Sequence, residues 1–272
     1  MSTLSIPPSS MPPAFGAPAS SFNTLNLDID DGEPLDSIWH AKEITILMQS
    51  MEWHWRDRED KFIGGNCFVY FDPHQAKDRN FRGPDFLVVK DAPWRERGCW
   101  IVWEEGGRVP DLVVELMSPT TKHVDLTTKR DIYEKILRTP EYVAYDPATR
   151  ELLAWRLKKG QYKPLKANDK GRIYLEQVDL WIGTAQCEVD GHEGCWLRFF
   201  DADGRMILTG KEGEAELKRI AEARADAEAT LKRKETVRAN REAIRADAEA
   251  AKAEALAREV AELKARLAKS DK

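Results

Sequence analysis

The composition of the chain changes abruptly at Glu212, and this break constrains the fold more than any other feature. No proline follows Pro164, Gly213 is the last glycine, and eighteen alanines lie between residues 211 and 272. Alanine, glutamate, lysine and arginine are among the residues with the highest helix propensity. We therefore expect one long, charged helix over residues 211–270, separate from whatever folds before it.

The far end of this expected helix also has the spacing of a coiled coil. Apolar residues there step by four, three and four: Leu256, Val260, Leu263 and Leu267. This is the repeat of a coiled-coil seam. Upstream the repeat fails, because the same seam would carry Glu242 and Glu249. We expect a coiled coil at this end, and a second copy of the chain is the simplest partner.

The residues before the break can hold one domain of ordinary size. Residues 1–34 are rich in proline and serine and show no periodicity, so they are expected to form a disordered arm. No apolar run is long enough to span a membrane. The N-terminus lacks the basic and apolar regions of a signal peptide, so the cytoplasm is the expected location.

The two parts of the chain differ in charge. From Lys211 onward the formal net charge is +2, whereas the part before it carries −7. A protein that binds nucleic acid usually shows a basic face, so the acidic first part leans against a nuclease. It is compatible with a metal site lined by carboxylates, where the ion supplies the positive charge.

A first helix is expected over residues 35–54, where apolar residues recur at helical spacing: Ile38, Ala41, Ile44, Met48 and Met51. Short β-branched and aromatic runs, bounded by turn signals, then predict strands over 66–71, 86–90, 99–103 and 112–116. A helix over 125–137 follows, with Asp125 as its N-cap and an apolar face that includes Ile132, Ile136 and Leu137.

The run at 142–145 predicts a strand directly after that helix. A strand, a helix and a strand with short joints imply a crossover and a parallel pair of strands. Residues 152–157 and 161–165 then predict a hairpin, and β-rich sequence continues to about residue 200. The fold class is therefore α/β with a mixed sheet flanked by helices, in a domain over residues 35–205.

Two carboxylates and a lysine stand out as candidates for chemistry. Glu115 lies within an apolar strand, where an ionised carboxylate is costly unless it is paired or bound to metal. Asp85 stands at the mouth of another strand, and strands about 4.8 Å apart can let two carboxylates share an ion. Metal-assisted hydrolysis of a phosphodiester needs such oxygen ligands and a nearby positive group, and Lys129 follows in the same informative stretch.

Ordered motifs support this interpretation. They are R-x-P-D at 82–85, W-x-V-W-E-E at 100–105, P-D-L-V-V-E-L-M-S-P-T-T at 110–121, K-R-D-I-Y-E at 129–134 and E-Y-V-A-Y-D-P at 141–147. In these motifs the chain resembles, over about residues 36–200, the Uma-type putative restriction endonuclease family of the PD-(D/E)XK nuclease superfamily. The resemblance implies a restriction-endonuclease-like core that hydrolyses DNA with Mg²⁺, or Mn²⁺, and often acts as a dimer.

By this resemblance Asp85 and Glu115 correspond to the two acidic metal ligands and catalytic residues of the superfamily. The lysine expected two residues after the glutamate is replaced by Met117. The resemblance places the substitute on the following helix, where Lys129 is the first choice and Lys122 the second. Asp111 shares a strand face with Glu115, but it lies about 13 Å back along the strand, which favours Asp85 as ligand.

Other interpretations stay open at this point. Glu115 could be the buried partner of an arginine, Lys129 a solvated helix residue and Tyr133 a core residue. Asp85 and Asp111 both follow proline, and Pro-Asp is also an ordinary turn signal. The alternative function is that of a non-catalytic DNA-binding or assembly protein, built on a degenerate nuclease core with a coiled-coil tail.

Overall fold

The computed structural model describes residues 37–72 and 81–270, and the arm expected over residues 1–34 lies outside them. The chain divides into two compact units after Gly210. The first unit is a mixed α/β fold, as expected, and the second is a single helix.

A six-stranded sheet forms the centre of the first unit, in the order β1–β4–β6–β7–β8–β9. Its strands are β1 Lys61–Gly65, β4 Phe86–Lys90, β6 Leu112–Leu116, β7 Glu141–Asp146, β8 Glu151–Lys158 and β9 Gln161–Pro164. Strands β6 and β7 pair in parallel, and the other neighbours pair antiparallel. The expected mixed sheet, the parallel pair and the hairpin of β8 and β9 are thus confirmed.

The helix that crosses over from β6 to β7 is longer and less regular than expected. It comprises α2 Lys122–Val124, η2 Asp125–Lys129, α3 Arg130–Ile132 and η3 Tyr133–Leu137, of which η2 and η3 are π-helical. The expectation that Asp125 is the N-cap is wrong, because Thr121 occupies that position. The side-chain oxygens of Ser118 and Thr121 each accept a hydrogen bond from the other's backbone N–H, so the helix begins earlier.

The helix α1, Ile38–His54, begins after the N-cap Ser37, whose side chain accepts a hydrogen bond from the backbone N–H of His40. It buries Ile44, Leu47 and Met51. The expected apolar face is therefore only partly right, since Ile38 is exposed. The same correction applies to Ile136 on the crossover helix, which is exposed although its neighbour Leu137 is buried.

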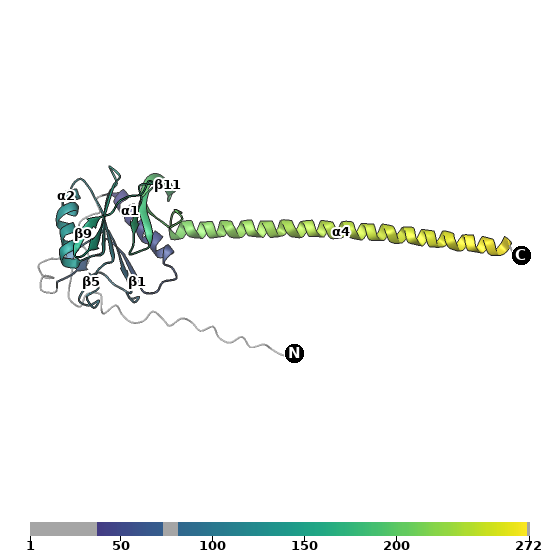
Figure 1. Ribbon diagram of the computed structural model, residues 1–272, viewed down its shortest axis with the longest axis horizontal. Coiled ribbons are helices and arrows are strands. Elements are labelled where there is room, and N and C mark those ends of the chain that lie inside the picture. The colour runs from purple at the N-terminus through teal and green to yellow at the C-terminus, as the bar shows by residue number, and fades with distance from the viewer. Residues whose placement is uncertain (1–36, 73–80, 271–272) are drawn as a thin grey trace, which may run out of the picture. The chain divides into compact units, whose positions relative to one another are not determined.

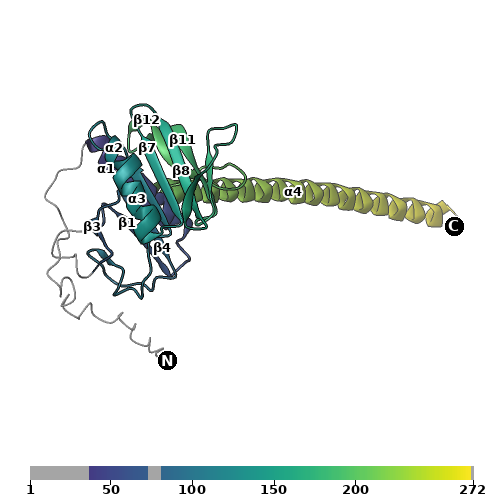
Figure 2. The same ribbon diagram turned by 60° about the vertical axis from the view of Figure 1, so that its left-hand side comes forward.

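Helices and a second sheet cover the two faces of the central sheet. On one face α1 shares a core with a three-stranded sheet of β10 Ile173–Leu175, β11 Leu180–Val189 and β12 His192–Phe200. On the other face the crossover helix packs through Tyr133 and Leu137. Figure 1 shows α1 and the crossover helix on opposite sides of the strands, and in Figure 2 the crossover helix lies in front of them.

The alternation along β6 decides which layer Glu115 meets. Leu112, Val114 and Leu116 belong to the core under α1, whereas Val113 and Met117 belong to the core under the crossover helix. Because side chains alternate along a strand, Glu115 lies on the side of Val113 and faces the crossover helix.

A small sheet of three two-residue strands completes this unit, with β3 Phe81–Arg82, β2 Val69–Tyr70 and β5 Trp100–Ile101 in that order. The strands expected over 66–71 and 99–103 are therefore real but much shorter. The strands expected over 86–90 and 112–116 have the bounds of β4 and β6.

The second unit contains α4, a helix of 61 residues from Gly210 to Ser270. The helix predicted from the composition break is present over its whole expected length (Figure 1). Its apolar side chains, including Leu217, Leu231, Leu256 and Leu263, are exposed. Among the described residues no helix is both long enough and apolar enough to cross a membrane.

Candidate active site

Asp85 and Glu115 lie opposite each other at the ends of two neighbouring strands. Strands β4 and β6 pair antiparallel with Phe86 opposite Val114, which sets Asp85 opposite Glu115. Directly opposed residues have their side chains on the same face, with Cβ atoms about 4.5–5.5 Å apart. The Asp85 carboxylate is anchored there, since its Oδ2 accepts a hydrogen bond of 2.6 Å from the backbone N–H of Leu116.

The crossover helix supplies two partners to Glu115. Lys129 Nζ donates to Glu115 Oε2 at 2.9 Å, and the Tyr133 hydroxyl donates to Oε1 at 3.1 Å. The side chain of Glu115 is only 1% exposed, and that of Lys129 is 23% exposed. The partner of Glu115 is therefore a lysine rather than an arginine, and Lys129 is not a solvated helix residue.

Asp125 brings a further carboxylate to the same cluster. Its Oδ1 lies 2.8 Å from Lys129 Nζ, and its side chain is as buried as that of Glu115. Asp125 and Lys129 are the first and last residues of the π-helical segment η2. Such segments occur frequently at functional sites. The hydroxyl of Tyr142 on β7 donates to the backbone oxygen of Asp125 at 2.8 Å and so fixes the helix against the sheet.

The electrostatics of the cluster reflect an excess of buried negative charge. Burial raises the pKa of Glu115 above its ordinary value; the Lys129 ammonium opposes this, and the neighbouring Asp85 and Asp125 add to it. Burial disfavours the ammonium of Lys129, but Glu115 and Asp125 outweigh it together, and the pKa of Lys129 lies above its ordinary value. The lysine thus stays charged between the two carboxylates.

The two competing candidates lie elsewhere. Lys122 Nζ pairs with Asp146 Oδ2 at 2.9 Å and with Glu151 Oε2 at 2.8 Å, so the structure does not bring it to Glu115. Asp111 lies just before β6, at the end opposite to Glu115, where its Oδ2 accepts a hydrogen bond of 2.7 Å from the backbone N–H of Lys90.

Sequence reasoning missed His40 and gave Asp125 a different role. His40 Nε2 lies 2.8 Å from Asp85 Oδ1, so α1 reaches the site from the opposite layer. No local pattern marks a histidine in the first turn of an amphipathic helix as a partner of a distant aspartate. Asp125 could have been found, because its spacing of four residues from Lys129 sets the two side chains on one helix face.

The donor set fits a hard divalent cation. Within residues 37–72 and 81–270 no group of three or more histidine, cysteine, aspartate or glutamate side chains forms a ready metal site. Mg²⁺ usually takes only one or two protein carboxylates and keeps several waters, which Asp85 and Glu115 can satisfy. The buried oxygens of Asp125 accept no hydrogen bond from the described residues, although Lys129 Nζ lies close by. Such oxygens are suited to an ion or to its water.

Comparisons with known proteins identify the family of the chain. No curated protein matches the chain. One solved structure, described as a putative nuclease belonging to DUF820 from Anabaena variabilis ATCC 29413, is 12% identical with a TM-score of 0.39, covering 55% of this chain and 81% of that chain. The model of the Uma2 family, described as "Putative restriction endonuclease", matches residues 24–183. That span includes Asp85, Glu115 and Lys129 and more than half of the 272 residues, so the chain belongs to the Uma2 family of nuclease-type proteins.

Proposed function

We propose that the protein is a metal-dependent endonuclease that hydrolyses phosphodiester bonds of DNA. The observation that carries the proposal is Glu115, a carboxylate buried in an apolar strand, opposite Asp85 and 2.9 Å from Lys129. Replacing a buried ion pair by apolar residues of similar volume is often neutral or stabilising. A cluster of this kind therefore gives the fold little that apolar residues could not give, which supports a functional role.

Asp85 and Glu115 would hold Mg²⁺ or Mn²⁺. When bound, the cation would polarise the scissile phosphate and lower the pKa of a coordinated water. The ammonium of Lys129 would orient the attacking water or stabilise the negative charge that develops on the phosphate. Tyr133 fixes one oxygen of Glu115, and His40 fixes one oxygen of Asp85. Both act as positioning residues.

A second copy of the chain would complete the enzyme at the far end of α4. Leu256, Val260 and Leu263 are exposed there at coiled-coil spacing, and such a seam needs an apolar partner. A dimer would supply two sites, as the cleavage of both strands of a duplex requires.

The test is a cleavage assay with supercoiled plasmid in the presence of Mg²⁺ or Mn²⁺. The full chain should nick or linearise the plasmid, and EDTA should abolish the reaction. Glu115→Gln should be inactive while remaining folded, because glutamine keeps the shape and its amide oxygen can still accept from Lys129, which also keeps its ion pair with Asp125. Its amide NH₂ group can donate to the Tyr133 hydroxyl, which reverses that hydrogen bond. Glu43→Gln is the matched control, since Glu43 is also a buried carboxylate but accepts its hydrogen bond from the backbone N–H of Leu197.

A non-catalytic DNA-binding or assembly protein would give a different result. It would bind DNA without metal-dependent turnover, and Glu115→Gln would behave like the unmodified chain. Cleavage that survives both EDTA and Glu115→Gln would also overturn the proposal.

A further inference from the structure

The positive charge of α4 is concentrated in one short segment. Residues 232–245 contain six lysines and arginines and two acidic residues, a net charge of +4. The whole segment from Lys211 to the end carries only +2, so the rest of it is net acidic. An alternating pattern of charges along a solvated helix would not produce this concentration.

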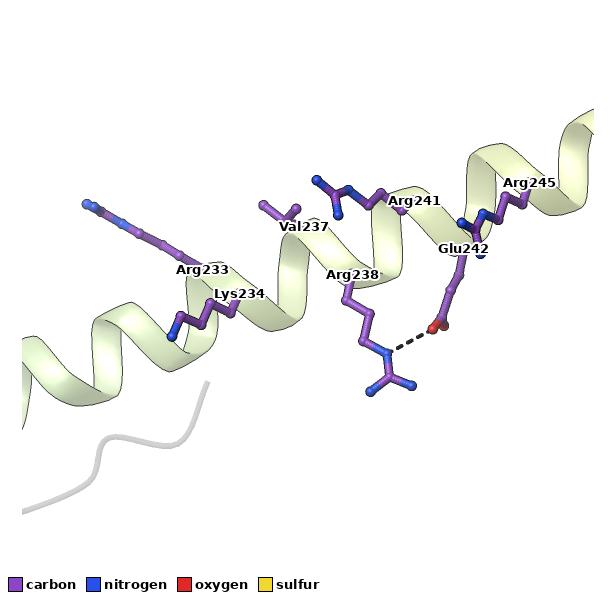
Figure 3. Close-up of a pocket in the computed structure, with 7 residues that line it drawn as sticks. All are labelled: Arg233, Lys234, Val237, Arg238, Arg241, Glu242 and Arg245. Atoms are coloured by element: carbon purple, nitrogen blue, oxygen red, sulfur yellow. Dashed lines mark hydrogen bonds and ion pairs between the residues drawn. The ribbon is translucent and has the colours of Figure 1, made fainter.

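Four of these basic residues share one face of the helix. Lys234, Arg238, Arg241 and Arg245 step by four, three and four residues, which at 3.6 residues per turn keeps them in one row. We call this row the basic stripe. All four side chains are exposed, and together with Arg233, Val237 and Glu242 they line a shallow pocket on the helix (Figure 3).

The acidic side chains of α4 leave most of the basic stripe unneutralised. Arg238 pairs with Glu242 at 2.9 Å, the contact that is dashed in Figure 3. Among the side chains that the structure describes, no ion pair joins Lys234, Arg241 or Arg245 to a carboxylate. The basic stripe therefore offers at least three uncompensated charges over about 16 Å of helix, given a rise of about 1.5 Å per residue.

A second copy of α4 is a poor partner for this face. The stripe lies in the row that continues the apolar residues Leu217, Ile220 and Leu231, which is one residue out of step with the seam of Leu256, Val260 and Leu263. A two-stranded coil through the Leu217 row would bring the stripe to the interface. The midpoint of α4 is residue 240 and that of the stripe lies beside it. A fully overlapping pair would then place basic residues against basic residues, whether parallel or antiparallel, and like charges at a seam repel.

We propose that the basic stripe of α4 is a binding surface for the phosphate backbone of duplex DNA, without sequence preference. The inference rests on the proposed function, which makes DNA the substrate. A duplex carries one negative charge per about 1.7 Å of its axis, so it can neutralise every residue of the stripe at once. The residues before Lys211 carry a net charge of −7, so the first unit as a whole is not basic. The stripe supplies the basic surface that DNA binding needs.

The experiment measures binding of a short labelled duplex by fluorescence anisotropy, with the full chain and with EDTA present so that no cleavage occurs. The test variant replaces the stripe by glutamine: Lys234→Gln, Arg238→Gln, Arg241→Gln and Arg245→Gln. The matched control makes the same charge change elsewhere on α4: Lys218→Gln, Arg219→Gln, Arg258→Gln and Lys264→Gln. Glutamine has a helix propensity similar to that of lysine and arginine, and far-UV circular dichroism verifies that both variants keep their helix.

The full chain should bind the duplex with an affinity that falls steeply with salt. A contact with Z phosphates gives a slope of about −0.9Z in log K against log salt. Losing the four residues of the stripe should thus weaken binding at low salt by at least tenfold and make the slope shallower by about 3.6. The control should change the affinity by no more than about threefold.

Equal weakening in both variants would overturn the inference, because net charge alone would then explain it. So would a full chain that does not bind the duplex, or one that binds phosphatidylserine vesicles or an acidic polypeptide at least as tightly. Glu115→Gln, assayed in parallel, separates the two proposals. DNA binding through the stripe without any metal-dependent cleavage would overturn the proposed function alone, and cleavage with an irrelevant stripe would overturn this inference alone.

Discussion

Replacement of Lys129 by methionine distinguishes the two candidates for the catalytic lysine, Lys129 and Lys122. They differ most in how deeply their ion pairs are buried. Lys129 Nζ lies 2.9 Å from Glu115 and 2.8 Å from Asp125, and both carboxylates are 1% exposed. Removing one partner of a buried ion pair typically costs about 3–5 kcal/mol. The loss should fall toward about 3 kcal/mol, because the raised pKa of Glu115 lets that carboxyl take up a proton.

Lys122→Met is the matched control, because Lys122 also bridges two carboxylates. Its side chain is 35% exposed and its partner Glu151 is 45% exposed. Ion pairs exposed in this way contribute about 0–1 kcal/mol. The other partner of Lys122, Asp146, is 10% exposed but keeps the hydrogen bonds from the backbone N–H groups of Ala148 and Thr149 when Lys122 is removed. Urea unfolding should therefore show a large loss of unfolding free energy for Lys129→Met and a small one for Lys122→Met.

Cleavage should separate the two lysines in the same direction. Removing one group that stabilises developing charge typically costs about 10²–10³-fold in rate, so Lys129→Met should lose at least that much. Lys122→Met should keep its rate within a few-fold.

Instability can also lower activity, so the double variant Lys129→Met with Glu115→Gln is needed. It removes the buried charge of Glu115 together with its counter-charge, and it should recover part of the lost stability while staying inactive. Equal stability losses for Lys129→Met and Lys122→Met, or cleavage that depends on Lys122 alone, would refute the assignment.

Three further predictions concern other parts of the molecule. Asp85→Asn should abolish plasmid cleavage and Asp111→Asn should not, because Asp111 is held by the backbone of Lys90 at the opposite end of β6; the reverse result would move the metal site. Burial raises the pKa of Glu43 from 4.5 to about 8, although its hydrogen bond from Leu197 opposes the shift. Between pH 4.5 and about 8 the folded chain keeps a proton that the unfolded chain releases, so the free energy of unfolding falls as pH rises through this range. Glu43→Gln should flatten that fall, by on the order of 1–3 kcal/mol in unfolding free energy, and a variant with an unchanged pH profile would contradict the reasoning. Truncation after Gly210 should leave the melting transition of the first unit nearly unchanged while lowering the association state measured by light scattering, and an equal number of copies per particle in both forms would defeat the association claim.

Local patterns were sufficient to predict the strands that carry the site. Strands β4 and β6 are short β-branched runs between turn signals, and their bounds follow from the sequence alone. The parallel pairing of β6 with β7 follows from the short joints on either side of the crossover helix. Because Glu115 belongs to β6 and Asp85 directly precedes β4, their proximity could be anticipated from the sequence.

Tertiary packing decided what the sequence could not predict. Strand β1 includes Gly64 and Gly65, which weaken a strand and hide it from propensity. A Cβ at Gly65 would lie 2.2 Å from Met48 Sδ and 2.6 Å from Ile44 Cγ2, so the glycine is required where α1 crosses closely. The contact of His40 with Asp85 depends on the same packing of α1 and likewise has no local signal.

The net acidic charge of the first unit argues against a nuclease less strongly once the positions of the charged groups are known. A net charge averages over groups that act separately. The carboxylates at the site are buried beside Lys129, whereas the basic stripe of α4 is exposed. Salt screens exposed charges much more than buried ones. If both proposals hold, a higher salt concentration should weaken binding of the duplex steeply. The Mg²⁺ concentration that gives half of the maximal rise in melting temperature should change only slightly. A parallel salt dependence of the two would mean that metal and DNA are bound by charges in the same environment, and the division between a buried metal site and an exposed DNA-binding helix would be wrong.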